Sequence, residues 1–193
     1  VDVTGRRLYP GGAAPGSELQ WPGWIFPLEP GGTSGAQSLA DPWLTHLADV
    51  PTPITFDEAA LERVAALAGL YDAADPDLSR YRDAGGKLLI YHGWSDPAIP
   101  PLGTLAYRQA VLDAMGGQAG VSDFLRLYMI PGLGHCVDGE GPDSFDALTP
   151  MLRWVEHGVA PHSLVAVDHD TGRARPIFPY PHVARYLGHG SID

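Results

Sequence analysis

Residues 85–97 read Gly-Gly-Lys-Leu-Leu-Ile-Tyr-His-Gly-Trp-Ser-Asp-Pro, and their pattern is the strongest indication of the fold class. Its centre, residues 87–92, is a nearly continuous apolar run that follows a Gly-Gly turn signal. Such runs are typical of strands buried on both faces in parallel sheets, whereas strands with one wet face alternate apolar and polar residues. The sequence therefore predicts a buried strand that ends at the polar loop Ser95-Asp96-Pro97.

The segments downstream of this strand continue the same pattern. A helical pattern over 101–115 ends at Gly116, and a second apolar run at 124–130 follows it. A third helix is expected over about 144–157, and a short strand at 164–167. The order strand, helix, strand, helix is typical of parallel sheets, so we expect an α/β fold.

The segment upstream of the strand is irregular. Residues 1–54 are rich in Gly, Pro and Trp and show little periodicity, which is typical of a lid or subdomain built from loops. The sequence Thr55-Phe56-Asp57-Glu58 matches a capping box, in which a threonine and a glutamate bond reciprocally to the first turn of a helix. We expect that helix to end at Gly69, before an acidic connector.

The composition of the chain argues against nucleic-acid-binding and membrane-spanning proteins. The chain has 193 residues and a formal net charge of −11, which disfavours nucleic acid and anionic membranes as partners. No apolar run approaches the ~20 residues of a membrane span. The sequence contains one cysteine, Cys136, which is either a buried thiol or half of an intermolecular disulfide.

Two ionisable residues follow the two predicted strands. Asp96 comes after the strand at 87–92, and His135 comes after the strand at 124–130. Functional groups collect at the carboxyl ends of parallel strands, so these side chains can meet at one edge of the sheet. A carboxylate beside an imidazole is the acid–base pair of a serine hydrolase, and the order acid then histidine is that of an α/β hydrolase.

The serine nucleophile of such a site is missing from the sequence. α/β hydrolases carry it in Gly-x-Ser-x-Gly on a turn between a strand and a helix, and no such motif occurs here. Ser17 has no apolar strand before it, and Ser95 is better interpreted as a loop residue. We therefore expect the serine on a preceding part of the protein, cleaved off or present as another chain.

Several longer stretches together resemble the tannase and feruloyl esterase family of α/β hydrolases, over most of the chain. These stretches are Tyr9-Pro10-Gly11 with Pro15-Gly16-Ser17-Glu18 and Trp21, residues 85–96, residues 123–136, Trp154-Val155-Glu156-His157-Gly158, and residues 175–181. The resemblance implies that residues 1–75 are the end of a lid subdomain with its connector. It also implies that residues 76–193 are the C-terminal part of an α/β-hydrolase catalytic domain.

The resemblance also implies roles for individual residues. Asp96 is then the triad acid, His135 the general base, and Ile99 a residue that lines the substrate pocket. Relatives pair a cysteine before the serine with one after the histidine, so Cys136 is expected to form a disulfide with the missing part. That pairing implies a secreted protein, extracellular or periplasmic.

The expected metal and cofactor, and the remaining histidines and tryptophans, are interpreted as follows. The family's lid binds structural calcium, whose ligands we expect outside this chain, and no cofactor is expected for the chemistry. The cluster Asp168-His169-Asp170 is interpreted as exposed turn charge rather than as a metal site, and His92 as a packed strand residue. For Trp21, Trp24 and Trp43 we expect lid packing more than stacking on a substrate.

The function predicted from these observations is hydrolysis of phenolic esters, of the hydroxycinnamate or gallate type. A triad of the missing serine with His135 and Asp96 would carry it through an acyl-enzyme. Two alternatives stay open at this point. One is another serine hydrolase of the same fold, such as a peptidase or a lactone hydrolase, and the other is a non-catalytic binding subunit.

Overall fold

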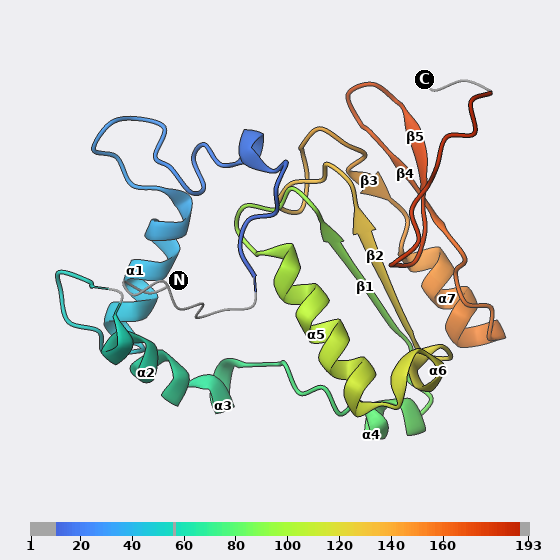
Figure 1. The fold of residues 1–193 in the computed structure, drawn as a ribbon, viewed down its shortest axis with the longest axis horizontal. Helices are drawn as coiled ribbons and strands as arrows, with labels where there is room; N and C mark the ends of the chain where they lie inside the picture. Colours follow the sequence, from blue (N-terminus) through green and yellow to red (C-terminus); the bar gives the residue numbers. More distant parts are fainter. Residues whose placement is uncertain (1–10, 56, 190–193) are drawn as a thin grey trace.

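The computed structural model describes residues 11–55 and 57–189, so Tyr9, Pro10 and Phe56 of the motifs above lie outside the described residues. Helices alone occupy the first part of the described chain, and strands and helices are mixed from residue 88 onward (Figure 1). Their order is η1 (Glu18–Gln20), α1 (Gly35–His46), α2 (Glu58–Ala66), α3 (Ala68–Tyr71), α4 (Ser79–Asp83), β1 (Leu88–Gly93), α5 (Pro101–Ala114), α6 (Gly117–Val121), β2 (Leu125–Ile130), β3 (Ser144–Phe145), α7 (Leu148–His157), β4 (Leu164–Val167) and β5 (Ala174–Ile177).

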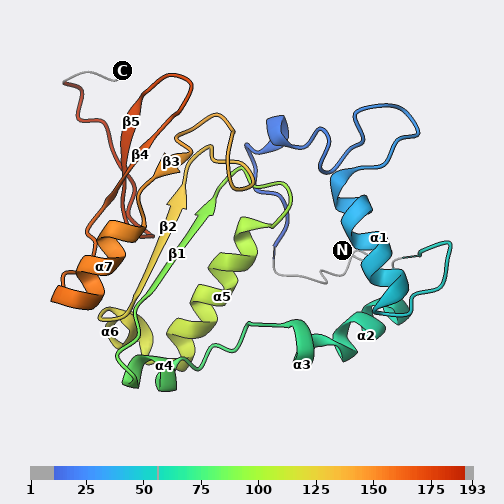
Figure 2. The same cartoon turned by 180° about the vertical axis from the view of Figure 1, so that it is seen from behind.

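The two predicted apolar runs form the parallel pair that the sequence indicates. β1 and β2 pair in parallel, with Leu88 opposite Leu125 and Gly93 opposite Ile130. α5 crosses between them and lies along one face of the pair in both views (Figures 1 and 2). It begins at Pro101, whose fixed φ suits the first helical position, and the chain turns at Gly116, whose φ is +82°. The helix predicted over 101–115 is confirmed.

A second, antiparallel sheet lies beside the parallel pair. β4 coincides with the strand predicted at 164–167, and it pairs with β3 on one side and β5 on the other. The strands β3 and β5 were not predicted, because they are short and lie in Pro-rich or polar sequence. Their apolar side chains share a core with β2, in which Tyr128 and Ala166 have no exposed surface. The hydroxyl of Tyr128 donates a 2.8 Å hydrogen bond to the carbonyl of Pro161 and so ties the two sheets together.

The helix predicted over 144–157 is shorter in the structure. α7 begins at Leu148, and residues 144–145 form β3 instead. The side chain of Asp146 accepts a 2.9 Å hydrogen bond from the backbone N–H of Thr149 in the first turn. Pro150 lies within that first turn, where a helix does not need its missing N–H, so it does not kink the helix.

The N-terminal region contains more helix than the sequence indicates. α1 occupies Gly35–His46 despite Pro42, and the side chain of Ser34 caps it by accepting from the N–H of Gln37. The expected capping box at Thr55 is wrong. Asp57 is the N-cap of α2, because its carboxylate accepts a 3.0 Å hydrogen bond from the N–H of Ala60. Gly69 does not end that helix either, since it lies inside α3.

The helices α1, α2 and α3 form a group of their own, away from the parallel pair (Figures 1 and 2). A small apolar cluster holds this group together, and its buried members include Leu44, Val50 and Ala60. An extended segment then leads to α4 and β1. The division at residue 75 lies in that segment and stays a prediction. Within the described residues, we find no helix with the length and apolar character needed to cross a membrane.

Candidate active site

Asp96 and His135 lie on neighbouring loops at the carboxyl ends of the parallel strands. The loop after β1 and the loop after β2 are tied together by their backbones. Trp94 donates a 2.9 Å hydrogen bond to the carbonyl of Ile130, and Ser95 donates one of 3.0 Å to the carbonyl of Leu133. These bonds extend the pairing of the strands beyond their last residues and bring the two side chains to the same edge.

Gly93 makes this close approach feasible. A Cβ atom at position 93 would lie 2.2 Å from the carbonyl oxygen of Leu133, a separation at which two atoms collide. Gly139 plays the same role within the histidine loop, where a Cβ would lie 2.0 Å from the carbonyl oxygen of Gly132 and φ is +109°. The glycines around the two loops therefore permit backbone contacts that any side chain would prevent.

The side chains of Asp96 and His135 are hydrogen-bonded. The Nδ1 atom of His135 lies 3.0 Å from Oδ2 and 3.2 Å from Oδ1 of Asp96. The Asp96 side chain is only 7% exposed, whereas that of His135 is 30% exposed. A carboxylate accepts hydrogen bonds, so Nδ1 is the donor and Nε2 is left to act as a base toward the open side.

The carboxylate of Asp96 is held by more than His135. Its Oδ1 atom accepts hydrogen bonds of 2.8 Å from the N–H of Ala98 and 2.9 Å from the N–H of Ile99. Burial alone would favour the protonated acid, but the hydrogen bonds from His92, Ile99, His135 and Ala98 outweigh it. They hold the pKa of Asp96 well below its usual range, so the group is a fixed negative charge.

His92 belongs to this site, although the sequence suggested only a packed strand residue. Its Nε2 atom lies 3.0 Å from the carbonyl of Ile99 and 3.3 Å from Oδ2 of Asp96. A carbonyl oxygen only accepts, so Nε2 carries a hydrogen and donates. The other ring nitrogen lies 2.7 Å from the hydroxyl of Thr104 on α5. The sequence does not reveal this contact with Asp96, because the pattern of a strand does not show that a histidine within it turns toward a loop four residues later.

Ile99 and Cys136 flank the pair on the same loops. The residue Ile99 is 53% exposed, and its backbone binds both Asp96 and His92. The role of Ile99 in lining a substrate pocket stays a prediction. Cys136 is exposed in this chain, which contradicts the alternative of a buried thiol. The disulfide stays a prediction.

One of the three N-terminal tryptophans reaches the site. Trp24 packs against the ring of His135 in an edge-on arrangement, with ring centroids 5.1 Å apart. Trp21 instead packs on Phe26 and donates its indole N–H to Ser17, and Trp43 packs on Tyr71. The segment that precedes α1 therefore covers the histidine, as the path of residues 11–34 past the ends of β1 and β2 shows (Figure 2).

A cluster of ionisable groups lies beyond the histidine loop. Ligand atoms of Asp138, Asp143 and His169 lie within 4.8 Å of one another. His169 lies in the turn between β4 and β5, where it binds Asp143 through Nδ1 and lies 3.2 Å from Asp170 through Nε2. The hydrogen bond and the charge of Asp143 raise the pKa of His169. Calcium prefers six to eight oxygen ligands, so this ion-paired group does not fit it.

A catalytic triad also needs a serine, and the described residues bring no serine hydroxyl to His135. The hydroxyl of Ser17 is buried and donates to the carbonyl of Ala14. Ser95 is buried in the acid loop, beside Asp96. Among the described residues no serine hydroxyl is hydrogen-bonded to His135, so the described site contains a carboxylate–imidazole pair without a serine beside it.

Comparisons with known proteins agree with this geometry. The family model described as "Tannase and feruloyl esterase" matches residues 33–193. A mono(2-hydroxyethyl) terephthalate hydrolase from Piscinibacter sakaiensis is 37% identical over 176 residues, which cover 78% of this chain and 29% of that protein. A probable feruloyl esterase from Arthroderma benhamiae is 40% identical over 122 residues, covering 60% of this chain and 23% of that protein.

The same relationship holds among solved structures. The crystal structure of feruloyl esterase B from Aspergillus oryzae superposes with a TM-score of 0.74 at 28% identity, covering 99% of this chain and 41% of that one. The chain thus spans less than half the length of the proteins it matches, and its fold is part of an α/β-hydrolase fold. On the match of residues 33–193, the chain belongs to the tannase and feruloyl esterase family.

Proposed function

We propose that this chain supplies the acid and the base of a serine carboxylic ester hydrolase whose serine lies on another part of the protein. The observation that carries the proposal is the buried Asp96 carboxylate within 3.0 Å of Nδ1 of His135. In this arrangement the carboxylate fixes the tautomer of the ring and stabilises the imidazolium that forms when Nε2 takes a proton.

The reaction follows from the roles of these groups. The serine oxygen attacks the ester carbonyl while Nε2 of His135 removes the serine proton. When the tetrahedral intermediate collapses, His135 gives that proton to the leaving alcohol and an acyl-enzyme remains. Water then attacks the acyl-enzyme carbonyl while Nε2 of His135 takes its proton, and His135 returns that proton to the serine oxygen as the carboxylic acid is released. Asp96 stays ionised throughout, in keeping with its depressed pKa.

The substrates we propose are esters of aromatic acids. Relatives are named for feruloyl esters, for tannin and for mono(2-hydroxyethyl) terephthalate, which share an aromatic acyl group. Trp24 beside His135 and the exposed Ile99 on the acid loop supply apolar surface next to the reacting groups. Aromatic surface of this kind favours an aromatic acyl group over a short aliphatic one.

The preceding part of the protein is a partner in this proposal. Within the described residues, β1 has a strand neighbour on one side only, and parallel sheets are normally larger and covered. The exposure of Cys136, next to His135, supports a disulfide from this chain to a loop that carries the serine. Such a disulfide is consistent with a secreted protein.

The test uses the full-length protein, with every part that co-purifies with this chain. Methyl ferulate, methyl gallate, a peptide and a lactone are assayed in parallel, and the trapped acyl-enzyme is mapped by mass spectrometry. The proposal predicts turnover of the aromatic esters and an acylated serine outside this chain. Turnover of only the peptide or the lactone supports a different serine hydrolase, and binding without turnover supports a non-catalytic subunit.

A further inference from the structure

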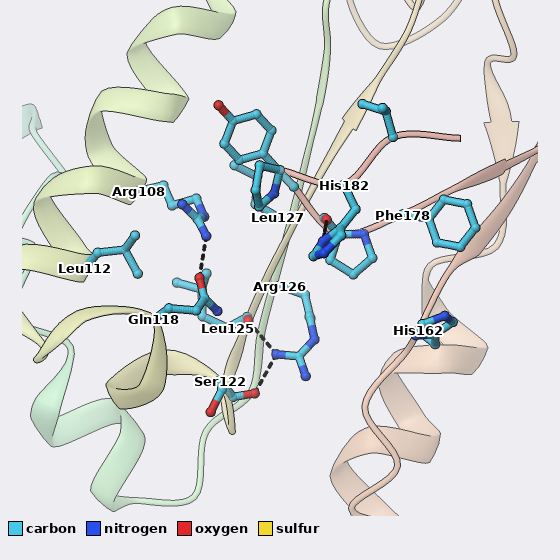
Figure 3. A pocket seen from close by; sticks show the side chains of 14 residues that line it. Arg108, Leu112, Gln118, Ser122, Leu125, Arg126, Leu127, His162, Phe178 and His182 are labelled. Carbon is cyan, nitrogen blue, oxygen red and sulfur yellow. Dashed lines mark hydrogen bonds between the residues drawn. The ribbon is translucent and has the colours of Figure 1, made fainter. Parts of the chain in front are cut away.

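A pocket of about 870 Å³ lies between α5, α6, the start of β2 and the C-terminal tail (Figure 3). It is remote from the candidate active site, because Leu125 and Leu127 line it at the amino-terminal half of β2 while His135 follows the other end. Its size lies within the range of roughly 300–1,000 Å³ that is usual for small-molecule sites. Nothing in the proposed ester hydrolysis uses it.

The charge of this pocket is opposite to that of the chain. The chain has 23 acidic and 12 basic residues, yet none of the residues that line the pocket is acidic. Two arginines and two histidines line it, from four separate segments: Arg108, Arg126, His162 and His182. A local excess of positive charge in an acidic protein indicates a place for an anion.

Neither guanidinium has an acidic partner within residues 11–55 and 57–189. Arg108 is 8% exposed, donates a 2.7 Å hydrogen bond to the neutral side chain of Gln118, and lies over the ring of Tyr180. Burial lowers the pKa of Arg108, which is the direction expected for a cation without a counter-ion. Buried charges are normally paired, so this one is available to a ligand.

The Arg126 guanidinium is held in place by hydrogen bonds from one of its nitrogens only. Its Nη1 atom donates to the carbonyls of Ser122 and Leu125, and its guanidinium lies over the ring of Trp154, 5.1 Å from the centroid. Figure 3 shows Arg108 on α5 directed at Gln118, and Arg126 on β2 directed at the carbonyls of Ser122 and Leu125. A fixed guanidinium with free N–H groups matches the two oxygens of a carboxylate.

Apart from two neutral polar residues, the rest of the lining is apolar or aromatic, and it indicates the body of the ligand. It includes Leu112, Phe178 and Val183. An inorganic anion would leave these apolar side chains exposed to water, whereas an organic acid with an aromatic ring would bury them. We propose that this pocket binds an aromatic carboxylate, with its charged end at Arg108, its ring against the apolar wall, and Arg126 adding to the positive charge of the pocket. The proposal does not depend on the proposed hydrolysis.

The test titrates the full-length protein with 4-fluorobenzoate and with the neutral 4-fluorobenzamide, followed by ¹⁹F NMR. The charged acid is expected to bind at least about tenfold more tightly than the amide, because charge-assisted hydrogen bonds are lost in the amide. Gln118→Glu places a carboxylate of the same shape against Arg108, and we expect it to weaken benzoate binding by about tenfold. Because the added charge pairs with Arg108, this variant keeps its fold and its melting temperature.

Arg80→Gln is the matched control, since Arg80 is exposed and lies outside the pocket. It should bind benzoate as the unaltered protein does. Benzoate held at the Asp96–His135 site is unaffected by Gln118→Glu, so the difference between the two proteins isolates the pocket. Equal binding of acid and amide, full benzoate affinity in Gln118→Glu, or no benzoate binding to the unaltered protein overturns the proposal. The last result is expected if an acidic group of the preceding part fills the pocket.

Discussion

The Nε2 atom of His92 lies 3.3 Å from Oδ2 of Asp96, so the candidate triad acid is held between two histidines. His135 faces the open side, while His92 is anchored from behind by Thr104. A carboxylate fixed on both sides keeps one orientation as His135 moves protons. This preorganisation makes His92 a positioning residue that acts through Asp96.

Replacing His92 with leucine should lower kcat for an aromatic ester by about 10–100-fold and leave KM within about twofold, because the acid loses its orientation while the substrate surface is unchanged. His92→Gln keeps a side-chain N–H donor and should recover most of that loss. In an Asp96→Asn background, His92→Leu should have little further effect. Equal losses in both backgrounds would mean that His92 acts on the fold alone.

The depressed pKa of Asp96 makes folding stability depend on pH. The folded pKa lies below the unfolded value of about 3.9, so the stabilisation is fully present above about pH 4. It is lost as the pH falls toward the folded pKa. We therefore expect the difference in unfolding free energy between the unaltered protein and Asp96→Asn to shrink below about pH 4. Denaturant titrations from pH 7 to pH 2.5 measure it, and a difference that grows on acidification would contradict the assignment.

Gly93→Ala should destabilise the protein by about 1–3 kcal/mol and reduce turnover, because its Cβ would lie 2.2 Å from the carbonyl of Leu133. The acid loop and the histidine loop must then move apart. Gly69→Ala is the matched control, since no heavy atom beyond its chain neighbours and the backbone of its own helix lies within 4 Å of its Cβ position. Thermal unfolding and kcat are measured for both variants and are expected to change only in Gly93→Ala. If both variants behave alike, the close approach at Gly93 does not hold the site together.

Cys136 should be unreactive toward thiol reagents in the native full-length protein and reactive after reduction, because we expect it to form a disulfide with the preceding part. Non-reducing and reducing electrophoresis would then show one band resolving into two if the parts are separate chains. Peptide mapping locates the partner cysteine. A free, readily alkylated Cys136 in active protein would show that the serine loop is held by other contacts.

The sequence predicted the parts of the fold that local pattern controls. The apolar runs at β1 and β2 and the helix between them follow from periodicity, and together they place Asp96 and His135 at one edge. The strands β3 and β5 were missed because they exist only through pairing with β4. The capping box failed because Thr55 and Asp57 are both good caps, and the choice between them depends on where the helix packs.

The same limit applies to the site. The acid and the histidine could be found from their places after strands, because strand ends in a parallel sheet converge. His92 and Trp24 could not be assigned in this way, since their contacts with Asp96 and His135 depend on side-chain direction and on the path of a loop. The free cations of the pocket were likewise hidden, because sequence spacing does not reveal which arginines lack an acidic neighbour.

The roles of Asp96 and His135 as the acid and base of an esterase are tested by the turnover of one ester. The turnover of methyl ferulate is compared between the full-length protein and its Asp96→Asn variant, with the exposed Asp123→Asn as control. We expect kcat to fall roughly 10⁴-fold for Asp96→Asn, with the variant still folded at neutral pH, and to stay unchanged for Asp123→Asn. Turnover that survives Asp96→Asn within about tenfold would contradict these roles.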